Sequence, residues 1–472
     1  MERSKIKEEE VKFLIDESKK NPELFKRETF IDSPDFLEKI GIFFGKNKNF
    51  PMGYLKLWPQ DFIVEEKSMY GALETVDSGN LFDSEKNFSE NDPTIYATLV
   101  KCKLPTFEAT KDLAHFLKID QKKIQYAGIK DTDAITSQLI SIRGANAEEI
   151  KNAASVYYFL KNIYSGKGVV EVGSLRGNKF TVLIRTGSDF DKNQFKQNLE
   201  EIKKQGFFNF FYLQRFGSPR FINWFWGLLI LRGDYKNAVL SFLCSCGQRE
   251  IPYFKNLRDA IKKNADNWDK IAEIMKPFPL SLQNETRVVK YLQKNPEDFV
   301  GALNQIPDQI QLWVFAYASL LFNRKISEYI ENSASLPEKL PLILSKDKND
   351  WLPYYDFLKE DKISSQDLKN LTPFSDIQWK KREIKTREKV EIYKTKFVPE
   401  GVILSFFLSK GCYATAFLSH LFQLTTGLPS EDISNEIIDT KEILGGGSIK
   451  NLIEKFKEVT FSKSENIFGK SE

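Results

Sequence analysis

Apolar runs of strand length, separated by turns, dominate the first half of the chain. They occur at residues 54–58, 62–66, 94–103, 124–129, 139–142 and 175–185, and one more follows at 402–408. Helical spacing is found at 109–117, 147–154, 187–205 and 416–424, where apolar residues fall on one helix face. The pattern therefore predicts a sheet flanked by helices, an α/β (α+β) fold.

The middle of the chain follows a different pattern. From Phe221 to about Asn370 the spacing of apolar residues is largely helical, and 309–329 is the longest predicted helix. At 472 residues the chain is also too long for one ordinary core. We therefore predict four parts: a charged helical extension (1–50), a first sheet-forming part (51–205), an inserted helical lobe (206–376) and a second sheet-forming part (377–472).

Composition narrows the kinds of site that the chain can hold. It has four cysteines and two histidines, and Cys244 and Cys246 are too close together for the usual zinc spacing. The N-terminus is charged, without an apolar signal segment, and no apolar run is long enough to span a bilayer. We expect a cytoplasmic protein with no metal site, no cofactor and no membrane partner.

Two segments are candidates for nucleic-acid contact, although the net charge of the chain is only +4. The loop 206–220 interleaves aromatic residues with polar ones, which suits base stacking and phosphate binding. The run 380–396 holds eight Lys or Arg and three Glu. The side chains concerned are Gln214, Arg215 and Arg220 in the loop, and Lys380, Lys381 and Arg382 at the start of the run. A packed hinge and a solvated charged face are the respective alternatives.

The stretch YAGIKDTDAITSQ at 126–138 is the strongest candidate for chemistry. Its apolar run ends at Ile129, so that Lys130 and Asp131 fall on the loop beyond it, and Gly128 would let a ligand approach closely. Lys130 would favour the ionised form of Asp131 that a nucleophile requires. The alternative is a strand followed by a helix that Asp131 or Thr132 caps.

Three further positions are candidates for the site, although the sequence pattern alone is also explained by a common structural role for each. Lys56 alternates with apolar neighbours and could be a solvated lysine on a sheet edge. The dipeptide Gly177-Asn178 is typical of a hairpin turn. Phe180 is typical of a sheet core.

Six motifs, in this order, resemble one family, the tRNA pseudouridine synthases of the TruD type. They are YLKLWPQDFIVEE (54–66), AGIKDTDAITSQ (127–138), LRGNKFTVLIR (175–185), FFNFFYLQRFG (207–217), LWVFAYASLLFN (312–323) and LSKGCYATAFL (408–418). The resemblance implies the pseudouridine synthase fold, with a mixed, mainly antiparallel sheet flanked by helices. It also implies that 51–205 and 377–472 form one catalytic domain, split by an inserted TRUD lobe at 206–376.

The sequence departs from the family pattern in two respects. Ser419-His420 stands where the family usually has Arg-Glu. Residues 1–50 and the polar stretch 72–93 match no family segment.

Carried over residue by residue, the resemblance makes Asp131 the catalytic aspartate and Lys56 the active-site lysine that keeps it charged. It makes Asn178 the asparagine that orients the carboxylate, and Phe180 the ring that stacks on the target base. The resemblance also implies an activity, the isomerisation of a uridine to pseudouridine at position thirteen, in the D arm of a tRNA, without a cofactor. We expect the protein to be a monomer. Lys130 joins the arginines, lysines and glutamine named above as a possible RNA contact.

Two other functions remain open at this point. The first is a non-catalytic RNA-binding or RNA-folding protein on the same fold. The second is a two-carboxylate hydrolase that uses Asp131 and Asp133. The sequence argues against the first only through the presence of Asp131, Lys56, Asn178 and Phe180. Release of free uracil would favour the second.

Overall fold

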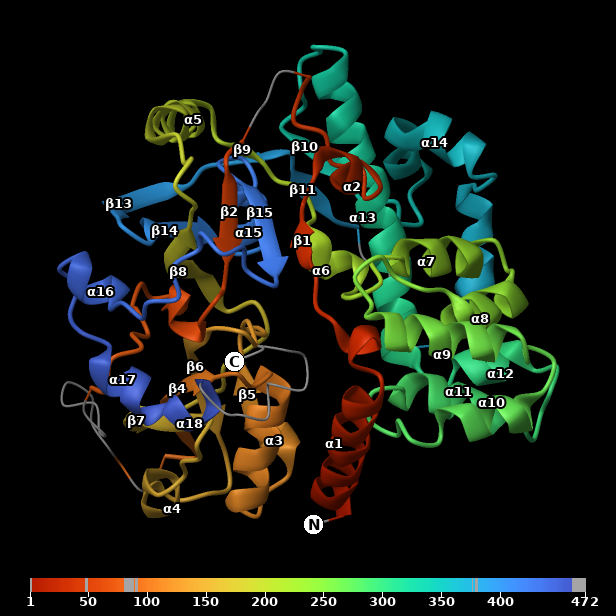
Figure 1. The fold of residues 1–472 in the computed structure, drawn as a ribbon, viewed down its shortest axis with the longest axis horizontal. Helices are drawn as coiled ribbons and strands as arrows, with labels where there is room; N and C mark the ends of the chain where they lie inside the picture. Colours follow the sequence, from red (N-terminus) through yellow and green to blue (C-terminus); the bar gives the residue numbers. More distant parts are fainter. Residues whose placement is uncertain are drawn as a thin grey trace. The chain divides into compact units, whose positions relative to one another are not determined.

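The computed structural model describes residues 2–46, 50–79, 89, 92–375, 377 and 381–460. The chain divides into two compact units (Figure 1). The sheet unit comprises Asn49–Phe207 and Glu388–Lys463, and the helical unit comprises Met1–Lys48 and Phe208–Arg387. The boundaries at 50, 205 and 376 that the sequence suggests remain predictions.

The strands of the sheet unit come from both of its segments. Each strand carries apolar or β-branched residues that suit a pleated, half-buried surface. The strands are β2 (Met52–Leu55), β3 (Phe62–Ser68), β4 (Thr94–Cys102), β5 (Ile124–Tyr126), β6 (Ile135–Ile142), β7 (Tyr158–Gly166), β8 (Leu175–Arg185), β13 (Glu391–Val398), β14 (Gly401–Ser409) and β15 (Gln423–Gly427).

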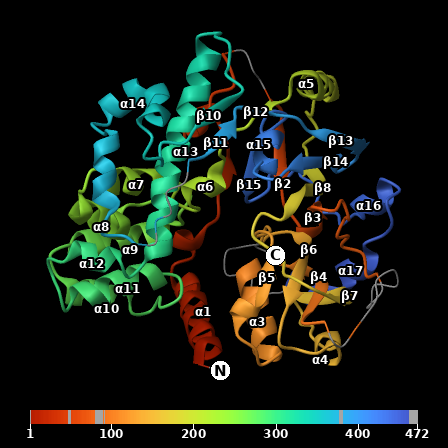
Figure 2. The ribbon, with the colours of Figure 1, turned by 180° about the vertical axis from the view of Figure 1, so that it is seen from behind.

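These strands form one sheet with β8 near its middle. Along it the order is β13-β14-β8-β3-β6-β4-β7; β2 extends the pairing of β8 beyond β3, and β5 pairs with β6. The neighbouring strands β6, β4 and β7 are seen together in both views (Figure 1, Figure 2). Only the β3–β6 and β15–β2 pairings within this unit are parallel. The predicted mixed, mainly antiparallel sheet is therefore confirmed.

Helices cover both faces of this sheet, because alternate residues of a strand point to opposite sides. Leu99 of β4 packs in a core with α3, whereas Val100 packs in another core with α17 and α18. The helices of the sheet unit are α3 (Thr106–Phe116), α4 (Ala147–Lys151), α5 (Lys192–Gln205), α15 (Ala414–Leu418), α16 (Thr440–Ile443), α17 (Lys450–Lys455) and α18 (Lys457–Thr460). We call the side of the sheet that carries α3 the front and the side that carries α17 and α18 the back.

The helical unit confirms the helical pattern expected after Phe221. Its helices are α1 (Glu2–Lys20), α2 (Pro34–Glu38), α6 (Leu213–Phe216), α7 (Asn223–Leu231), α8 (Tyr235–Cys244), α9 (Pro252–Lys262), α10 (Trp268–Met275), α11 (Gln283–Leu292), α12 (Phe299–Leu303), α13 (Pro307–Glu331) and α14 (Tyr355–Glu360). Its short strands are β1 (Thr29–Ile31), β10 (Lys339–Pro341) and β11 (Glu383–Lys385), and β9 (Phe207–Phe208) and β12 (Arg387–Glu388) stand where the chain passes between the units.

Helix α13 runs through the core of the helical unit. Trp226 of α7 packs on Trp313 of α13, and an added Cβ at Gly227 would lie 2.1 Å from the Trp313 carbonyl oxygen. Asn323, fully buried near the end of the Phe-Asn motif, donates to the carbonyl oxygens of Ile40 and Phe211 and accepts from the Phe211 N–H. Asn323 therefore serves the packing of this unit.

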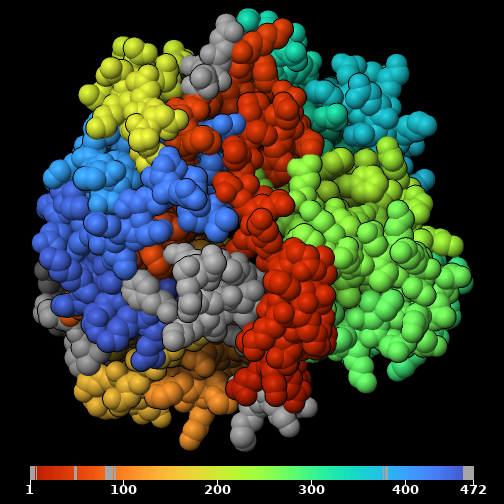
Figure 3. All heavy atoms as spheres, in the orientation of Figure 1, coloured from red at the N-terminus to blue at the C-terminus, as the bar shows by residue number. Residues whose placement is uncertain are grey.

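Helix α1 belongs to the same core. Leu14 is buried there, and the Glu10 carboxylate accepts hydrogen bonds from the backbone N–H groups of Leu280 and Ser281. In Figure 3 the side chains of α1, in red, lie against the green helices of the same unit. The N-terminal segment is thus packed on helices more than two hundred residues away in the sequence.

Three local expectations are wrong. The residues after Asp131 form a turn and then strand β6, so no helix is capped there. Gly177 and Asn178 lie within β8 and not in a hairpin turn. The helix predicted at 416–424 ends at Leu418, because the chain turns back to pair β15 with β2.

Two further points concern the limits of the described structure. Much of the predicted insertion 72–93 lies outside the described residues. In the part of the chain that the structure describes, no helix is both long and apolar enough to cross a membrane.

Candidate active site

Asp131 lies on the loop that joins β5 to β6 in the sheet unit. Its carboxylate oxygen Oδ1 accepts a hydrogen bond of 2.7 Å from the Lys56 ammonium, and the side chains of the two residues are 35% and 18% exposed. Burial pushes the pKa of Asp131 upward, but the charge and hydrogen bond of Lys56 and the charge of Lys101 hold that pKa below its usual value. The loop thus presents an ionised, partly covered carboxylate.

A second lysine stabilises the same loop through its backbone. Lys101, near the end of β4, is fully buried and donates a hydrogen bond of 2.6 Å to the backbone carbonyl oxygen of Asp131. Burial lowers the pKa of Lys101 to about 8, although the Asp131 carboxylate opposes this shift. Asp131 is therefore held by one amine at its side chain and by another at its backbone.

Lys130 points away from Asp131 and into the sheet. Its ammonium lies 2.6 Å from Glu66 Oε2 and donates a hydrogen bond of 2.8 Å to Asn178 Oδ1. Glu66 and Asn178 are directly opposite each other on β3 and β8, so that Lys130 ties the loop to both strands. The side chains of Lys130 and Glu66 are 4% and 1% exposed, and such a buried pair is costly to break.

Two polar side chains fix the backbone just before Asp131. The Thr106 hydroxyl accepts from the Lys130 N–H and donates to Gln138 Oε1, while the Gln138 amide donates to the Gly128 carbonyl oxygen. Gly128 lies outside the left-handed region and an added Cβ would meet no atom within 4 Å, so that the backbone itself does not require a glycine, and the close approach of a ligand stays a prediction. Hydrogen bonds from Thr106 and Gln138 therefore set the course of this loop.

Lys56 is held in an uncommon backbone conformation between β2 and β3. Its φ is +60°, in the left-handed region that lysine rarely adopts. The turn that follows is anchored by a buried ion pair, in which Arg185 Nε and Nη2 lie 2.8 and 2.9 Å from the two Asp61 carboxylate oxygens. The same Asp61 accepts from the Trp58 N–H. These contacts aim Lys56 at Asp131 and argue against a merely solvated edge lysine.

The Phe180 side chain is packed among other aromatic rings. It is 5% exposed, with its ring centroid 5.1 Å from that of Phe406 in a stacked arrangement and 5.9 Å from that of Phe62. Phe62 in turn lies under the Lys56 ammonium, 4.1 Å from its ring centroid. Phe180 therefore reaches the Lys56–Asp131 pair through Phe62.

The structure brings the four residues carried over from the family into one network. Lys56 contacts Asp131 directly, Asn178 connects through Lys130, and Phe180 connects through Phe62. Within the described residues the Asn178 amide makes no hydrogen bond to Asp131, so that any orienting effect on the carboxylate passes through Lys130. All of these side chains belong to the front of the sheet.

Asp133, which a two-carboxylate site would require, is placed apart from Asp131. Its side chain is 66% exposed and lies 3.6 Å from the Lys103 ammonium. The two carboxylates therefore have different partners and different exposure. In the described residues, no group of three or more His, Cys, Asp and Glu side chains is arranged to hold a metal ion.

Two of the predicted RNA contacts have side chains that are engaged inside the protein. Lys130 is used by Glu66 and Asn178, as described above. Arg220 donates to the Phe242 carbonyl oxygen and to Glu285, and its guanidinium lies over the Trp226 ring, 4.4 Å from the centroid. These contacts occupy donors that an RNA phosphate would need, and a role of either residue in RNA binding stays a prediction.

The other predicted RNA contacts remain predictions. Lys381 lies 3.0 and 3.3 Å from carboxylate oxygens of Asp347 and Asp350, and is 55% exposed. The guanidinium of Arg215 lies over Phe211 and that of Arg382 over Phe315, and Gln214 is exposed on α6. Lys380 lies outside the described residues.

The sequence analysis did not identify the residues that hold the Asp131 loop and the Lys56 turn in place. They are Glu66, Lys101, Thr106, Gln138 and the Asp61–Arg185 pair. Lys101 and Glu66 had one visible signal, since each is a charged residue within an otherwise apolar, strand-like run. A charged residue in a buried strand requires a partner, and here the partner is a functional loop.

The chain is similar in sequence to known proteins of one family. The model of the family described as tRNA pseudouridine synthase D (TruD) matches residues 45–349. A relative from Methanosarcina acetivorans, named "Probable tRNA pseudouridine synthase D", is 30% identical over 312 residues, which are 65% of this chain and 66% of that protein. The chain thus spans just under two thirds of that relative. The "tRNA pseudouridine synthase D" of Aquifex aeolicus is 28% identical over 371 residues, or 69% of this chain and 91% of that protein.

A solved structure shares the fold. A crystal structure from Methanosarcina mazei with the same family description has a TM-score of 0.61 and 23% identity, and the match covers 82% of this chain and 97% of that one. At this identity the likeness concerns the fold alone. Because the family model matches well over half of the chain, this protein belongs to the tRNA pseudouridine synthase D (TruD) family.

Proposed function

We propose that this protein is a tRNA pseudouridine synthase in which Asp131 is the catalytic group. The observation that carries the proposal is the Asp131 carboxylate, which is held ionised at 2.7 Å from the Lys56 ammonium on a loop fixed by buried hydrogen bonds. The names of the relatives supply the substrate class, a tRNA. By the resemblance of its motifs, the target is a uridine at position thirteen in the D arm.

The reaction fits a single carboxylate. The C1′–N1 bond of uridine breaks, the uracil turns, and a C1′–C5 bond forms; C5 loses a proton and N1 gains one, so that the formula is unchanged. Asp131 acts on the sugar, as a nucleophile at C1′ or as a base toward the ribose. Lys56 keeps the carboxylate charged in partly covered surroundings, where an unpaired charge would be costly.

The other family positions act through their neighbours. Asn178 fixes Lys130, whose backbone leads directly into Asp131. Phe180 is buried beside Phe406, so that it supports Phe62 under the Lys56 ammonium, and it can stack on a base only if this packing opens. The finer expectations, a monomer acting in the cytoplasm, belong to the same proposal.

An Asp131→Asn variant tests the proposal, with Asp133→Asn as the matched control. The amide has nearly the shape of the carboxylate but no negative charge, so we expect the rate of pseudouridine formation to fall by about three orders of magnitude or more. RNA affinity should stay within a few-fold, and Asp133→Asn should remain active because its exposed carboxylate pairs with Lys103. The assay is site mapping of pseudouridine in a tRNA transcript incubated with the full chain.

Each other outcome of this assay is also informative. Normal product from Asp131→Asn would refute the catalytic role. Tight RNA binding by the unchanged chain without any product would support the non-catalytic alternative. Release of free uracil would instead indicate a hydrolase.

A further inference from the structure

A second concave site lies on the back of the sheet. A pocket of about 340 Å³ is formed by β3, β8, β13 and β14 together with α16 and the residues that follow it. It is lined by the four lysines Lys67, Lys179, Lys394 and Lys441, and no Asp or Glu is among its lining residues. The pocket lies entirely within the sheet unit.

Strand register separates this pocket from the candidate active site. On β8, Asn178 and Phe180 belong to the front of the sheet, and the alternate residues Lys179 and Thr181 line the pocket. On β14, Phe406 stacks on Phe180, whereas the flanking residues Ser405 and Phe407 line the pocket. One pair of strands therefore serves two sites on opposite faces.

Two hydroxyl side chains lie on the floor of the pocket. Thr181 and Ser405 lie opposite each other across β8 and β14 and are only 3% and 5% exposed. Neither hydroxyl makes a hydrogen bond to any described residue, and both line the pocket. Both hydroxyls are therefore free to donate a hydrogen bond to a ligand in the pocket.

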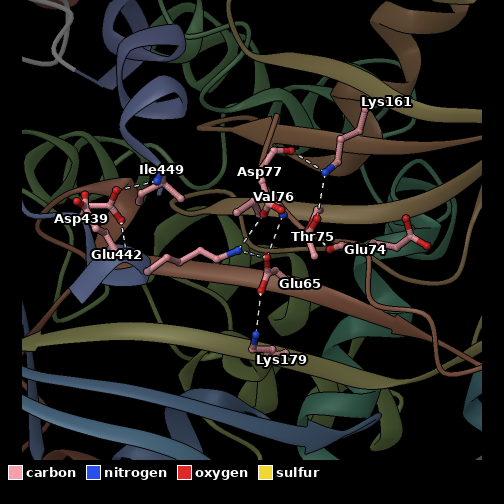
Figure 4. A network of polar contacts seen from close by, with 12 residues as sticks. Glu65, Glu74, Thr75, Val76, Asp77, Lys161, Lys179, Asp439, Glu442 and Ile449 are labelled. Atoms are coloured by element: carbon pink, nitrogen blue, oxygen red, sulfur yellow. Dashed lines mark hydrogen bonds and ion pairs between the residues drawn. The ribbon is translucent and has the colours of Figure 1, made fainter. Parts of the chain in front are cut away.

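The lysines of the pocket differ in how strongly their ammonium groups are engaged. Lys441 is used structurally, because its ammonium lies 2.7 Å from Glu65 Oε1 and 3.0 Å from Asp77 Oδ1. Figure 4 labels Glu65 and Asp77 of this network, and Lys179 beside Glu65. Lys179 forms a longer ion pair, with its ammonium 3.7 Å from Glu65 Oε2 and no hydrogen bond to it, and Lys67 has no ion-pair partner in the described part of the chain.

Aromatic side chains form another part of the lining. Phe407 lies beside the Lys67 ammonium, which is 5.3 Å from its ring centroid. Tyr393, at the irregularity of register between β13 and β14, is 42% exposed. Such rings suit the flat face of a nucleobase, and the volume lies in the range of small-molecule sites.

We propose that this pocket binds a phosphorylated nucleoside. Its phosphate accepts hydrogen bonds from Thr181, Ser405, Lys179 and Lys67, and its base lies against Phe407 and Tyr393. The same chemistry is offered by a free nucleotide and by a nucleotide of an RNA chain. The proposal does not depend on the reaction at Asp131, because the two sites use opposite faces of the sheet.

Adenosine 5′-monophosphate (AMP) is the probe, because it carries no uracil that could enter the site at Asp131. Calorimetric titration of the full chain should show saturable binding at millimolar concentration or below, and adenosine and inorganic phosphate should each bind more weakly. Thr181→Val with Ser405→Ala, which removes both hydroxyls at little change in shape, should weaken AMP binding about tenfold or more. Lys67→Met, at the pocket rim, should do the same without disturbing a buried pair.

Asp131→Asn is the matched control and should bind AMP as the unchanged chain does. Absence of AMP binding, or binding that neither pocket variant alters, would overturn the proposal. Addition of a tRNA transcript then distinguishes the source of the phosphate. Displacement of AMP assigns the pocket to the RNA chain, and binding of both assigns it to a free nucleotide.

Discussion

Asp131 and Lys101 are two charged residues whose pKa values are shifted by burial and by each other's charge. The proposed reaction requires Asp131 to be ionised although it is partly covered, and nearby amines lower its pKa. Lys101 supplies part of that effect, but it is fully buried, and its own pKa falls to about 8. A buried amine is a poor choice for stability, so that its presence beneath the loop indicates a functional role.

Replacing Lys101 with Met should separate stability from activity. The folded-state pKa of Lys101 lies below its ordinary value of 10.5, so that folding disfavours the charged form. The penalty is fully present below about pH 8 and disappears as the pH rises toward 10.5; the shift corresponds to about 3 kcal/mol at most. Near neutral pH, Lys101→Met should therefore be at least as stable as the unchanged chain in urea unfolding, and the difference should shrink at high pH.

The Lys101→Met change that leaves stability unchanged or higher near neutral pH should impair activity at low pH. In the proposed reaction the reactive form of Asp131 is the ionised one, which is lost as the pH falls through its lowered pKa. Removing the Lys101 charge raises that pKa, so that the acid limb of kcat/KM should move to higher pH. Lys103→Met, which removes a surface partner of Asp133, is the control and should leave the limb in place. An unmoved limb in Lys101→Met would show that Lys101 only fills space.

The sequence indicates which residue types the site needs, and it does not indicate how they connect. Lys56 and Asp131 could be named from motifs because each motif is short and local. The partners of Lys130 could not, since Glu66 lies on β3 and Asn178 on β8, and their meeting depends on strand register. Register arises from packing over the whole sheet, which a single sequence does not specify.

At the scale of elements, β8 is the strand on which both sites depend. It carries Asn178 and Phe180 to the front and Lys179 and Thr181 to the back. Its first half also needs a residue without a side chain, because an added Cβ at Gly177 would lie 2.1 Å from the Leu408 carbonyl oxygen of β14. The β8–β14 pairing therefore explains the glycine that the sequence alone favours as a turn.

Gly177→Ala should be clearly destabilising, with Gly128→Ala as its matched control. The methyl group at 177 must displace the β14 backbone, and overpacking of this kind costs about 1–3 kcal/mol. At Gly128 an added Cβ meets no atom within 4 Å, so the change should be neutral or stabilising by up to about 1 kcal/mol. Urea unfolding followed by circular dichroism measures both. Equal effects of the two variants would contradict the close approach of β14.

The sequence predicts well the elements whose apolar residues repeat regularly. It does not predict elements that form only because they pair with a distant strand. The helices after Phe221 and the strands β3, β4 and β8 follow their sequence patterns closely. Strand β15 was missed because its apolar residues continue the helical spacing of α15, and only pairing with β2 makes them a strand. Burial on both sides of a sheet overrides local preference in such segments.

At the scale of the whole molecule, the two units have separate cores, and the N-terminal segment belongs to the helical one. Leu14 and Phe25 pack in the same cluster as Trp226 and Trp313. The sequence pattern shows that α1 is amphipathic but does not indicate its partner, because the contacting residues are far away in the chain. Separate cores make separate unfolding the expectation.

Leu14→Ala should weaken the helical unit and leave the sheet unit intact. Leu14 is 7% exposed in the helical core, and truncation of a buried leucine costs about 2–5 kcal/mol. Among the described tryptophans, Trp224, Trp226, Trp268, Trp313 and Trp351 lie in the helical unit and Trp58 in the sheet unit, so that tryptophan fluorescence chiefly reports the helical unit. Its unfolding midpoint in urea should fall, while hydrogen exchange of β4, β6 and β8 stays slow. Lys12→Ala, exposed on the same helix, should change neither measurement. Equal loss of exchange protection in those strands would show that the two cores unfold as one.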